Sequence, residues 1–335
     1  MPKQSNKPAP EDNRYDFAVI GLGRMGWNLI LQAADKGFHV AGYTRGAAPG
    51  RAHPAGFLLL NGLATLRERL QKPRRVFVYI PAGPAIDELL LQLSSILEAG
   101  DIVLDGGNSY WGDSIRRAQR MSLQGIDFLD LGTSGGVDGA RNGACFMIGG
   151  PKTAVDRVAP VLRRLAVNGG YVHAGPSGAG HFTKLVHNGI EFGMLQAIGE
   201  GMALLNRYPQ RLPINDIVSC WRNGSVIRSW LIDLLEQRLR DDNVKEIPAV
   251  VEDTGEVNWL VADALELDVP VPVIATSVFE LSASRDRAGN AARAIAMMRH
   301  GFGGHPYGRS KALQKERRTS RVGGYVTPRQ SSSHE

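Results

Sequence analysis

The sequence is poor in cysteine, in aromatic residues and in long apolar runs, and each shortage excludes a class of protein. Its 335 residues include two cysteines, Cys145 and Cys220, so we expect neither a disulfide framework nor a metal site. No stretch approaches the ~20 consecutive apolar residues that a membrane helix requires. Residues 1–14 contain no apolar run, so a secretory signal is not expected either. These features predict a protein of the reducing cytoplasm with no membrane partner.

The charge of the chain is positive, with a formal net charge of +6 and a pI of about 9.4. Such a balance suits nucleic acid, an anionic surface or a small anionic substrate. Much of the excess lies near the end of the chain, at Lys311, Lys315, Arg317, Arg318 and Arg321. Aromatic residues are not interleaved with these cations, as a groove for single-stranded nucleic acid would require. We therefore do not expect nucleic acid as the partner.

The pattern of the chain changes near residue 176, and its length allows two domains. Strands and helices alternate over residues 15–176, which predicts a Rossmann-type, doubly wound, mostly parallel α/β sheet. Residues 177–310 predict only helices and so an all-helical domain. Polar composition predicts a disordered lead over residues 1–14 and a mobile basic tail over residues 311–335. Strands are expected at 16–20, 38–43, 75–80, 101–105, 127–131, 144–148 and 170–173, and helices of the second domain at 180–207, 213–221, 224–239, 254–267 and 270–300.

A glycine-rich turn follows the first predicted strand and precedes a helix. It matches the G-x-G-x-x-G pattern, whose glycines permit a tight turn, close approach of the backbone to a pyrophosphate, and close helix packing. Its context of strand, turn, helix and strand favours dinucleotide binding over a purely structural turn. The residues are Gly21, Leu22, Gly23, Arg24, Met25 and Gly26.

The end of the second strand bears on the choice of cofactor. An acidic residue there would accept a hydrogen bond from the adenosine ribose of NAD. This chain has Thr44 and Arg45 instead, which can donate to a 2′-phosphate. The pattern favours NADP, with NAD still possible, and the alternative is that Arg45 only decorates a loop.

Two further motifs follow predicted strands, Asp105-Gly-Gly-Asn-Ser109 and Thr133-Ser-Gly-Gly136. The carboxyl ends of parallel strands face the ligand crevice. Asn108 and Ser134 offer hydrogen bonds there to hydroxyls or a carboxylate, while small residues let a ligand approach the backbone. Ordinary turn chemistry explains either motif taken alone.

A polar stripe crosses the otherwise apolar helix predicted from residue 180. Its members are Lys184, His187, Asn188 and Glu191, which share one helix face at i, i+3, i+4 and i+7. Burial of this stripe without partners would cost several kcal/mol, so either the groups satisfy one another or a polar ligand lies on them. The alternative is an exposed, salt-bridged face.

Taken together, these motifs resemble the decarboxylating 6-phosphogluconate dehydrogenases, in their short form, a family within the β-hydroxyacid dehydrogenases. The resemblance covers residues 16–308 and is most specific at 180–191, 105–109, 132–136 and 302–305. It implies metal-free oxidative decarboxylation of a phosphorylated sugar acid. Lys184 would be the general base at the C3 hydroxyl, and Glu191 would protonate the enediol that remains after CO₂ leaves.

The resemblance also implies which residues bind the substrate. The sugar acid would be held by Asn108, Ser134, Gly135, Gly136, His187 and Asn188, with Asn108 also close to the cofactor. Arg299 and His305 would reach the substrate phosphate from a neighbouring subunit, with Arg287 as a further candidate. The family pattern therefore implies a homo-dimer or tetramer whose active sites are shared between subunits. From the residues alone, the cationic and glycine-rich segment 299–305 is more often a surface feature than a binding site.

The chain departs from the family pattern at Phe192, where most members have a tyrosine that binds the phosphate, and at Thr44, where many short members have aspartate. A lost hydrogen bond to a charged group costs about 1.5–3 kcal/mol. Phe192 leaves one alternative open, a related dehydrogenase for another sugar acid. A second alternative, from a different class, is a non-catalytic dinucleotide-binding sensor.

Overall fold

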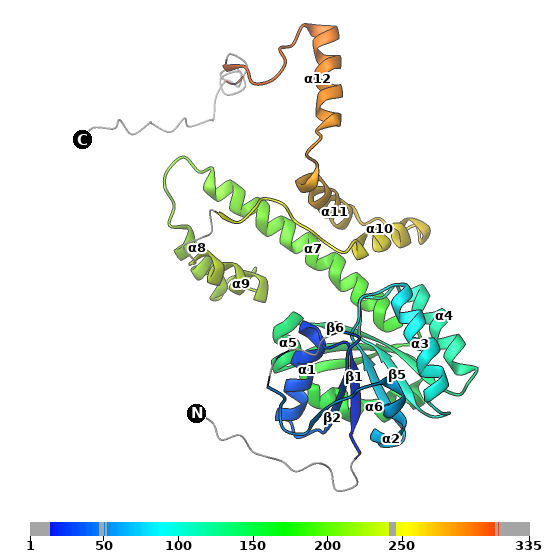
Figure 1. Cartoon of the computed structure of the whole chain (residues 1–335). Coiled ribbons are helices and arrows are strands. Elements are labelled where there is room, and N and C mark those ends of the chain that lie inside the picture. Colours follow the sequence, from blue (N-terminus) through cyan, green and yellow to red (C-terminus); the bar gives the residue numbers. More distant parts are fainter. Residues whose placement is uncertain (1–13, 47–49, 51, 241–245, 312–313, 315–335) are drawn as a thin grey trace. The chain divides into compact units, whose positions relative to one another are not determined.

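The computed structural model describes residues 14–46, 50, 52–240, 246–311 and 314 (Figure 1). The chain divides into two compact units. The first unit comprises the residues up to Gly189 together with Gly255–Leu267, and the second comprises Ile190–Thr254 and the residues from Asp268 onward. The predicted lead 1–14 and tail 311–335 lie almost entirely outside the described residues.

The first unit is built on an eight-stranded sheet with the order β3-β2-β1-β4-β5-β6-β7-β8. Pairing is parallel from β3 to β6 and again between β7 and β8, whereas β6 and β7 are antiparallel. This topology confirms the predicted Rossmann-type sheet. The strands are β1 (Phe17–Ile20), β2 (Val40–Tyr43), β3 (Phe57–Leu59), β4 (Arg75–Val78), β5 (Ile102–Asp105), β6 (Asp127–Ser134), β7 (Ala144–Gly149) and β8 (Ala166–Gly175).

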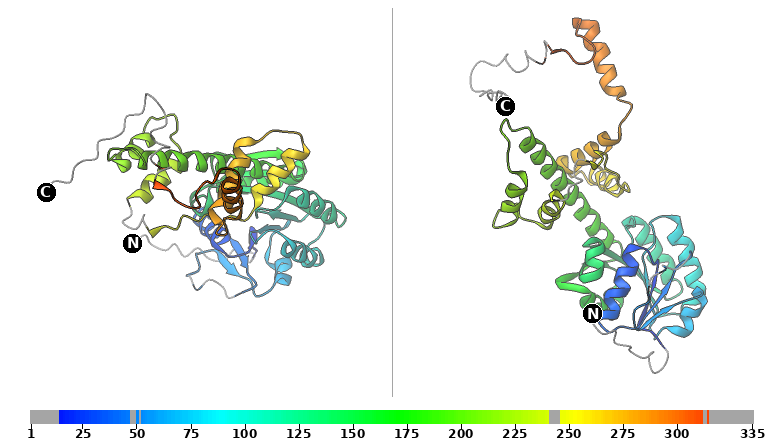
Figure 2. Two further views of the ribbon diagram at one scale, coloured as in Figure 1. Left: turned by 90° about the horizontal axis from the view of Figure 1, so that it is seen from above. Right: turned by 60° about the vertical axis from the view of Figure 1, so that its left-hand side comes forward.

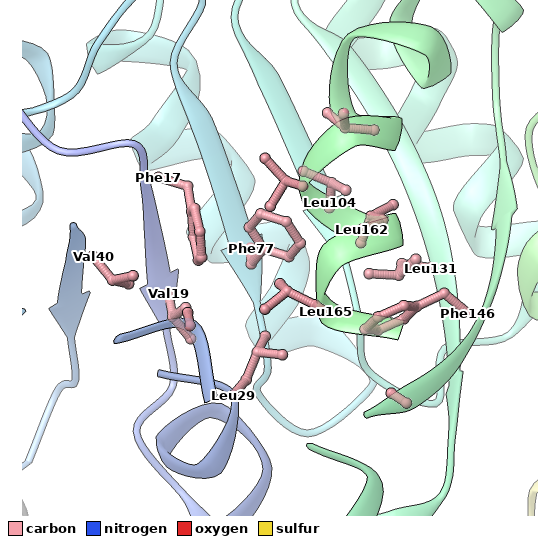
Figure 3. Packing of buried hydrophobic residues seen from close by; sticks show 14 of the residues in the cluster. Phe17, Val19, Leu29, Val40, Phe77, Leu104, Leu131, Phe146, Leu162 and Leu165 are labelled. Atoms are coloured by element: carbon pink, nitrogen blue, oxygen red, sulfur yellow. The ribbon is translucent and has the colours of Figure 1, made fainter. Parts of the chain in front are cut away.

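Helices cover both faces of this sheet (Figure 2), so its central strands are buried on both sides and read as continuous apolar runs. They are α1 (Arg24–Asp35), the 3₁₀ helix η1 (Leu63–Thr65), α2 (Leu66–Arg69), α3 (Pro84–Ile96), α4 (Trp111–Ser122), α5 (Gly136–Asn142) and α6 (Lys152–Leu165). Phe17 and Val19 of β1 pack in one apolar cluster with α1 and α6 (Figure 3). Ala18 and Ile20 pack in a second cluster with α2, α3 and α4.

Every described secondary-structure element of the second unit is a helix. Helix α7 (Ala179–Asn206) begins in the first unit and continues into the second, and α10 (Glu256–Glu266) belongs to the first. The others are α8 (Ile214–Arg222), α9 (Trp230–Leu239), α11 (Pro272–Arg285) and α12 (Asn290–Gly303). Among the described helices, none is long and apolar enough to cross a membrane.

Two of the predicted helices were wrong in extent. The helix expected over 224–239 begins only at Trp230, where the Ser229 side chain accepts a hydrogen bond from the Ile232 backbone N–H and caps it. The helix expected over 270–300 is two helices, because the Asp286 side chain accepts from the backbone N–H groups of Ala288 and Gly289. Such a local bond competes with helical hydrogen bonding and ends the helix.

Candidate active site

The glycine turn lies where β1 meets α1, beside β4. Gly21 has a φ of 97°, and a Cβ there would lie 2.2 Å from the backbone oxygen of Tyr79. A Cβ on Gly26 would lie 2.0 Å from the backbone oxygen of Gly21, so the helix packs closely on the strand. Gly23 is the exposed N-cap of α1 and has open space around its Cβ position. This arrangement fits a pyrophosphate at the helix N-terminus, at the point where strand order reverses.

Thr44 and Arg45 follow β2 at the same edge of the sheet. Thr44 is half-buried, whereas Arg45 is exposed and lies 3.5 Å from the carboxylate of Glu88 on α3. Both members of this pair are about 60% exposed, at 62% and 61%. An exposed pair of this kind contributes about 0–1 kcal/mol, so a ligand phosphate could displace Glu88 from the guanidinium at little cost.

The start of α7 is held against the sheet by a buried carboxylate. Asp130 of β6 is fully buried and accepts hydrogen bonds from the backbone N–H groups of Gly178, at 2.7 Å, and His181, at 2.9 Å. A Cβ on Gly180 would lie 2.4 Å from the Asp130 backbone oxygen, so the helix and strand are in backbone contact. Asp130 therefore helps to hold the first turn of α7 against the sheet.

A pocket opens beside these turns, and Lys184 lies in its wall with only 8% of its surface exposed. All of its lining residues belong to the first unit. They come from the loop after β5, from α7 and from α10, and are Asn108, Ser109, His181, Lys184, Leu185, Asn188, Glu256 and Trp259. We call this the Lys184 pocket.

Short polar contacts connect residues of α7 to one another and to β6. The Nζ of Lys184 lies 3.3 Å from Nδ1 of His187, whose Nε2 lies 3.0 Å from the hydroxyl oxygen of Ser134. The Oδ1 of Asn188 lies 3.2 Å from Nδ1 of His187. The Nδ2 of Asn188 donates to the carboxylate of Glu256 at 3.4 Å. Lys184, His187 and Asn188 therefore contact one another and are buried or half-buried, so this part of the stripe is not an exposed salt-bridged face.

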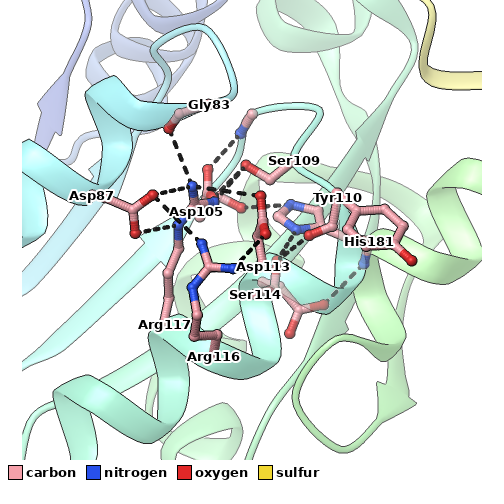
Figure 4. Close-up of polar contacts among 12 residues, drawn as sticks. Gly83, Asp87, Asp105, Ser109, Tyr110, Asp113, Ser114, Arg116, Arg117 and His181 are labelled. Atoms are coloured by element: carbon pink, nitrogen blue, oxygen red, sulfur yellow. Dashed lines mark hydrogen bonds and ion pairs between the residues drawn. The ribbon is translucent and has the colours of Figure 1, made fainter. Parts of the chain in front are cut away.

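Charged side chains contact the loop after β5 and hold it in place (Figure 4). Asp105 accepts from the hydroxyl of Ser109 at 2.7 Å and lies 3.7 Å from the guanidinium of Arg117. Arg117 also donates to Asp87, and these hydrogen bonds hold the pKa of Asp87 below its ordinary value despite partial burial. His181 contacts the backbone oxygen of Asp105 through Nε2 at 3.1 Å. The network supports the loop that carries Asn108.

Sequence models of two domains match the chain. Residues 16–175 match the NAD-binding domain of 6-phosphogluconate dehydrogenase, and residues 180–319 match the C-terminal domain of the same enzyme. The chain belongs to the 6-phosphogluconate dehydrogenase family. The resemblance that the motifs suggested is thereby confirmed.

Relatives in this family differ in length and in the cofactor that their names state. An NAD⁺-dependent, decarboxylating 6-phosphogluconate dehydrogenase of Haloferax volcanii is 39% identical, over 88% of this chain and 98% of that protein. A Bacillus subtilis enzyme of the same description is 36% identical, over 78% of this chain and 60% of that protein. The solved Plasmodium falciparum 6-phosphogluconate dehydrogenase, studied with NADP⁺ and with 6-phosphogluconate, has a TM-score of 0.74 and 28% identity, over 88% of this chain and 66% of that one.

The site residues that the family resemblance implies lie partly in the first unit and partly in the second. The first unit brings Asn108, Ser134, Lys184, His187 and Asn188 to one region, and Gly135 and Gly136 begin α5 directly after β6. Glu191 on α7 is half-buried and belongs to the second unit. The second unit also contains Arg287, Arg299 and His305. Arg287 is exposed between α11 and α12, and Arg299 is exposed on α12. His305 is half-buried and follows Gly304, the left-handed C-cap of α12.

Sequence reasoning did not predict several residues that line the Lys184 pocket. Ser109 and His181 lie in the motifs at 105–109 and 180–191, in which other residues were predicted as members of the site. Glu256 and Trp259 gave no local signal, because they begin an ordinary amphipathic helix 65 or more residues beyond the glutamate of the stripe. Their place in the pocket follows from tertiary packing alone.

Proposed function

We propose that the protein catalyses the oxidative decarboxylation of 6-phosphogluconate to ribulose 5-phosphate and CO₂, with reduction of NADP. The observation that supports this most directly is the buried Lys184, whose Nζ lies 3.3 Å from Nδ1 of His187, in a pocket of the same unit that carries the dinucleotide turn. A nicotinamide cofactor bound at the glycine turn would supply the hydride acceptor. The residues of the pocket supply the proton transfers and the orientation of the substrate.

In the first half-reaction, the Nζ of Lys184 takes the proton of the C3 hydroxyl while the hydrogen on C3 leaves as hydride. Asn108, Ser134 and Asn188 offer hydrogen bonds that orient the hydroxyls and the carboxylate of the sugar acid. The small residues Gly135 and Gly136 leave the backbone accessible to the substrate. Positioning of this kind lowers the barrier by removing the need to order the reactants during the reaction.

In the second half-reaction, the 3-keto acid loses its carboxyl carbon as CO₂. The electrons of the broken C1–C2 bond move toward the C3 carbonyl, whose oxygen the protonated Lys184 polarises. Glu191 then protonates C2 of the enediol and gives the ketopentose phosphate. Lys184 and Glu191 are seven residues apart in α7, on the same helix face, which supports this division of roles.

A panel of sugar acids tests the proposed substrate. We expect turnover with 6-phosphogluconate to exceed that with gluconate and with small 3-hydroxy acids, because the cationic residues of the proposed site suit a phosphate. Phe192, which lacks a hydroxyl, favours the second candidate, a dehydrogenase for another sugar acid. A higher kcat/KM for unphosphorylated gluconate than for 6-phosphogluconate would select that candidate instead.

For the cofactor, we propose a preference for NADP based on Thr44 and Arg45. Replacing Thr44 with aspartate is expected to lower the ratio of kcat/KM for NADP⁺ to that for NAD⁺ roughly tenfold or more, because a carboxylate repels the 2′-phosphate and accepts from a ribose hydroxyl. The steady-state rates with both cofactors measure this ratio. Thr153→Asp, at an exposed position of α6, is the matched control, and an unchanged ratio in Thr44→Asp would remove the argument for NADP.

We also propose that the protein is a homo-dimer or tetramer. Large apolar side chains are exposed along the helices of the second unit, among them Leu204 at 75%, Val273 at 68%, Phe279 at 66% and Met298 at 61%. Exposed apolar surface of this extent is typical of a protein–protein interface. A second copy that covers it would place Arg299 and His305 near a substrate phosphate of its partner, as the family resemblance implies.

Mixing two inactive variants tests this sharing of sites. Lys184→Ala and Arg299→Ala are each expected to be nearly inactive at low substrate concentration. If each site uses residues from two copies, refolding the variants together is expected to restore part of the activity, since some sites then carry both native residues. No recovery, with mixed oligomers shown to form by differential tagging, would contradict the sharing of sites.

A further inference from the structure

Glu256 brings a carboxylate to the Lys184 pocket from a distant part of the chain. It is the first residue of α10, and Asp263, seven residues later on the same helix face, anchors α10 to the first unit. The carboxylate of Asp263 accepts from the hydroxyl of Tyr110 at 3.1 Å and from Nε1 of Trp111 at 2.7 Å. Trp259, between the two carboxylates, packs edge-on against Tyr110. The position of Glu256 is therefore set by several contacts.

The carboxylate of Glu256 determines which way the amide of Asn188 points. An ionised carboxylate only accepts hydrogen bonds, so the Nδ2 of Asn188 must face Glu256, as the contact at 3.4 Å shows. With the amide turned over, two acceptor oxygens would meet. The Oδ1 of Asn188 consequently faces Nδ1 of His187, at 3.2 Å.

This orientation in turn favours one tautomer of the imidazole of His187. The Oδ1 of Asn188 only accepts, so its contact is a hydrogen bond when Nδ1 carries the hydrogen. Nε2 then accepts from the hydroxyl of Ser134, at 3.0 Å, and a hydroxyl can rotate to donate. All three contacts are satisfied in this one arrangement.

Lys184 competes for the same nitrogen. Its Nζ lies 3.3 Å from Nδ1 of His187, and an ammonium could donate there only if Nδ1 carried no hydrogen. We propose that Glu256 is a positioning residue for the reaction: through Asn188 it keeps the hydrogen on Nδ1 of His187, so that Lys184 is not held by the imidazole and is directed to the substrate hydroxyl. The kinetic part of this proposal rests on the proposed function, whereas the tautomer does not.

The tautomer is read directly by NMR of the full-length protein labelled with ¹⁵N-histidine, with the His187 signals identified by their loss in His187→Asn. We expect the Nδ1–H form in the unmodified protein. In Glu256→Gln we expect a shift toward the Nε2–H form, because the glutamine amide no longer dictates the orientation of Asn188. Glu266→Gln, an exposed change on the same helix, is the control and should leave the spectrum unchanged. An Nε2–H form in the unmodified protein, or the same tautomer in both proteins, would overturn the proposal.

Kinetics with 6-phosphogluconate give an independent readout. We expect kcat of Glu256→Gln to fall roughly tenfold or more, about the value of one hydrogen bond to a charged group, with KM for NADP⁺ unchanged. Glu256→Asp, which retains the charge, should recover part of kcat and keep the Nδ1–H form. A loss in Glu256→Gln that Glu256→Asp does not rescue at all, in a folded protein, would indicate a role in packing and contradict the proposal. If the unmodified protein does not oxidise 6-phosphogluconate, the proposed function fails while the tautomer measurement still decides the role of Glu256.

Discussion

Replacing Lys184 with alanine is expected to lower kcat roughly 10²–10⁴-fold, the usual contribution of a positioned general acid or base. Lys184 is buried in the wall of the pocket. In the proposed mechanism, the substitution removes both the acceptor of the C3 proton and the group that polarises the ketone. Cofactor binding should hardly change, because the glycine turn lies on β1 and α1. Steady-state kinetics and fluorescence titration with NADPH measure the two quantities separately.

The matched control is Lys152→Ala, which removes an exposed lysine on α6 whose described contact is the ion pair with Asp156. It should leave kcat and cofactor affinity unchanged. A folded Lys184→Ala protein that keeps near-normal kcat would mean that another group takes the proton, and the assignment of the base would be wrong. A loss of cofactor affinity equal to the loss of kcat would instead assign Lys184 to cofactor binding.

The second large effect is expected on stability, from Asp130→Ala. This carboxylate is fully buried and accepts two backbone N–H groups at the start of α7, so its removal leaves two buried donors without their acceptor. Hydrogen bonds to charged groups contribute about 1.5–3 kcal/mol each, which predicts a loss of about 3 kcal/mol or more in the free energy of unfolding. Urea denaturation followed by circular dichroism measures it.

Asp156→Ala, which removes an exposed carboxylate from α6, provides the comparison and should change the free energy of unfolding by less than about 0.5 kcal/mol. If Asp130→Ala loses no more than this control, Asp130 does not hold the start of α7. We also expect kcat of Asp130→Ala to fall in the folded protein, because the same turns of α7 carry Lys184 and Asn188.

The sheet could be predicted because its central strands are buried on both faces and so appear as short apolar runs with turn residues between them. Strand β3 was missed because its three residues pair with β2 alone and are only partly buried. Helix α5 was missed because it begins within the Gly135-Gly136 pair, which locally reads as a turn. In both cases the local pattern carried little information and tertiary pairing decided the structure.

The site was predictable where its residues follow a helical or strand-end pattern. The spacing of Lys184, His187 and Asn188 indicated one helix face, and the motif with Ser134 indicated the end of a strand. In the structure these four side chains form a chain of polar contacts of 3.0–3.3 Å. Asp130 and Glu256 were not predictable. Asp130 reads as an ordinary polar residue in a strand, and Glu256 contacts Asn188 across 68 residues of sequence.

The central claim is that oxidation and decarboxylation occur on one substrate in one site. It is tested most directly with 6-phosphogluconate labelled with ¹⁴C at C1, by measuring the labelled CO₂ released and the NADPH formed in the same reaction. We predict equal amounts of the two at all times, because the 3-keto acid is formed and decarboxylated in the same pocket. Formation of NADPH without release of labelled CO₂ would contradict the claim and leave a dehydrogenase that does not decarboxylate.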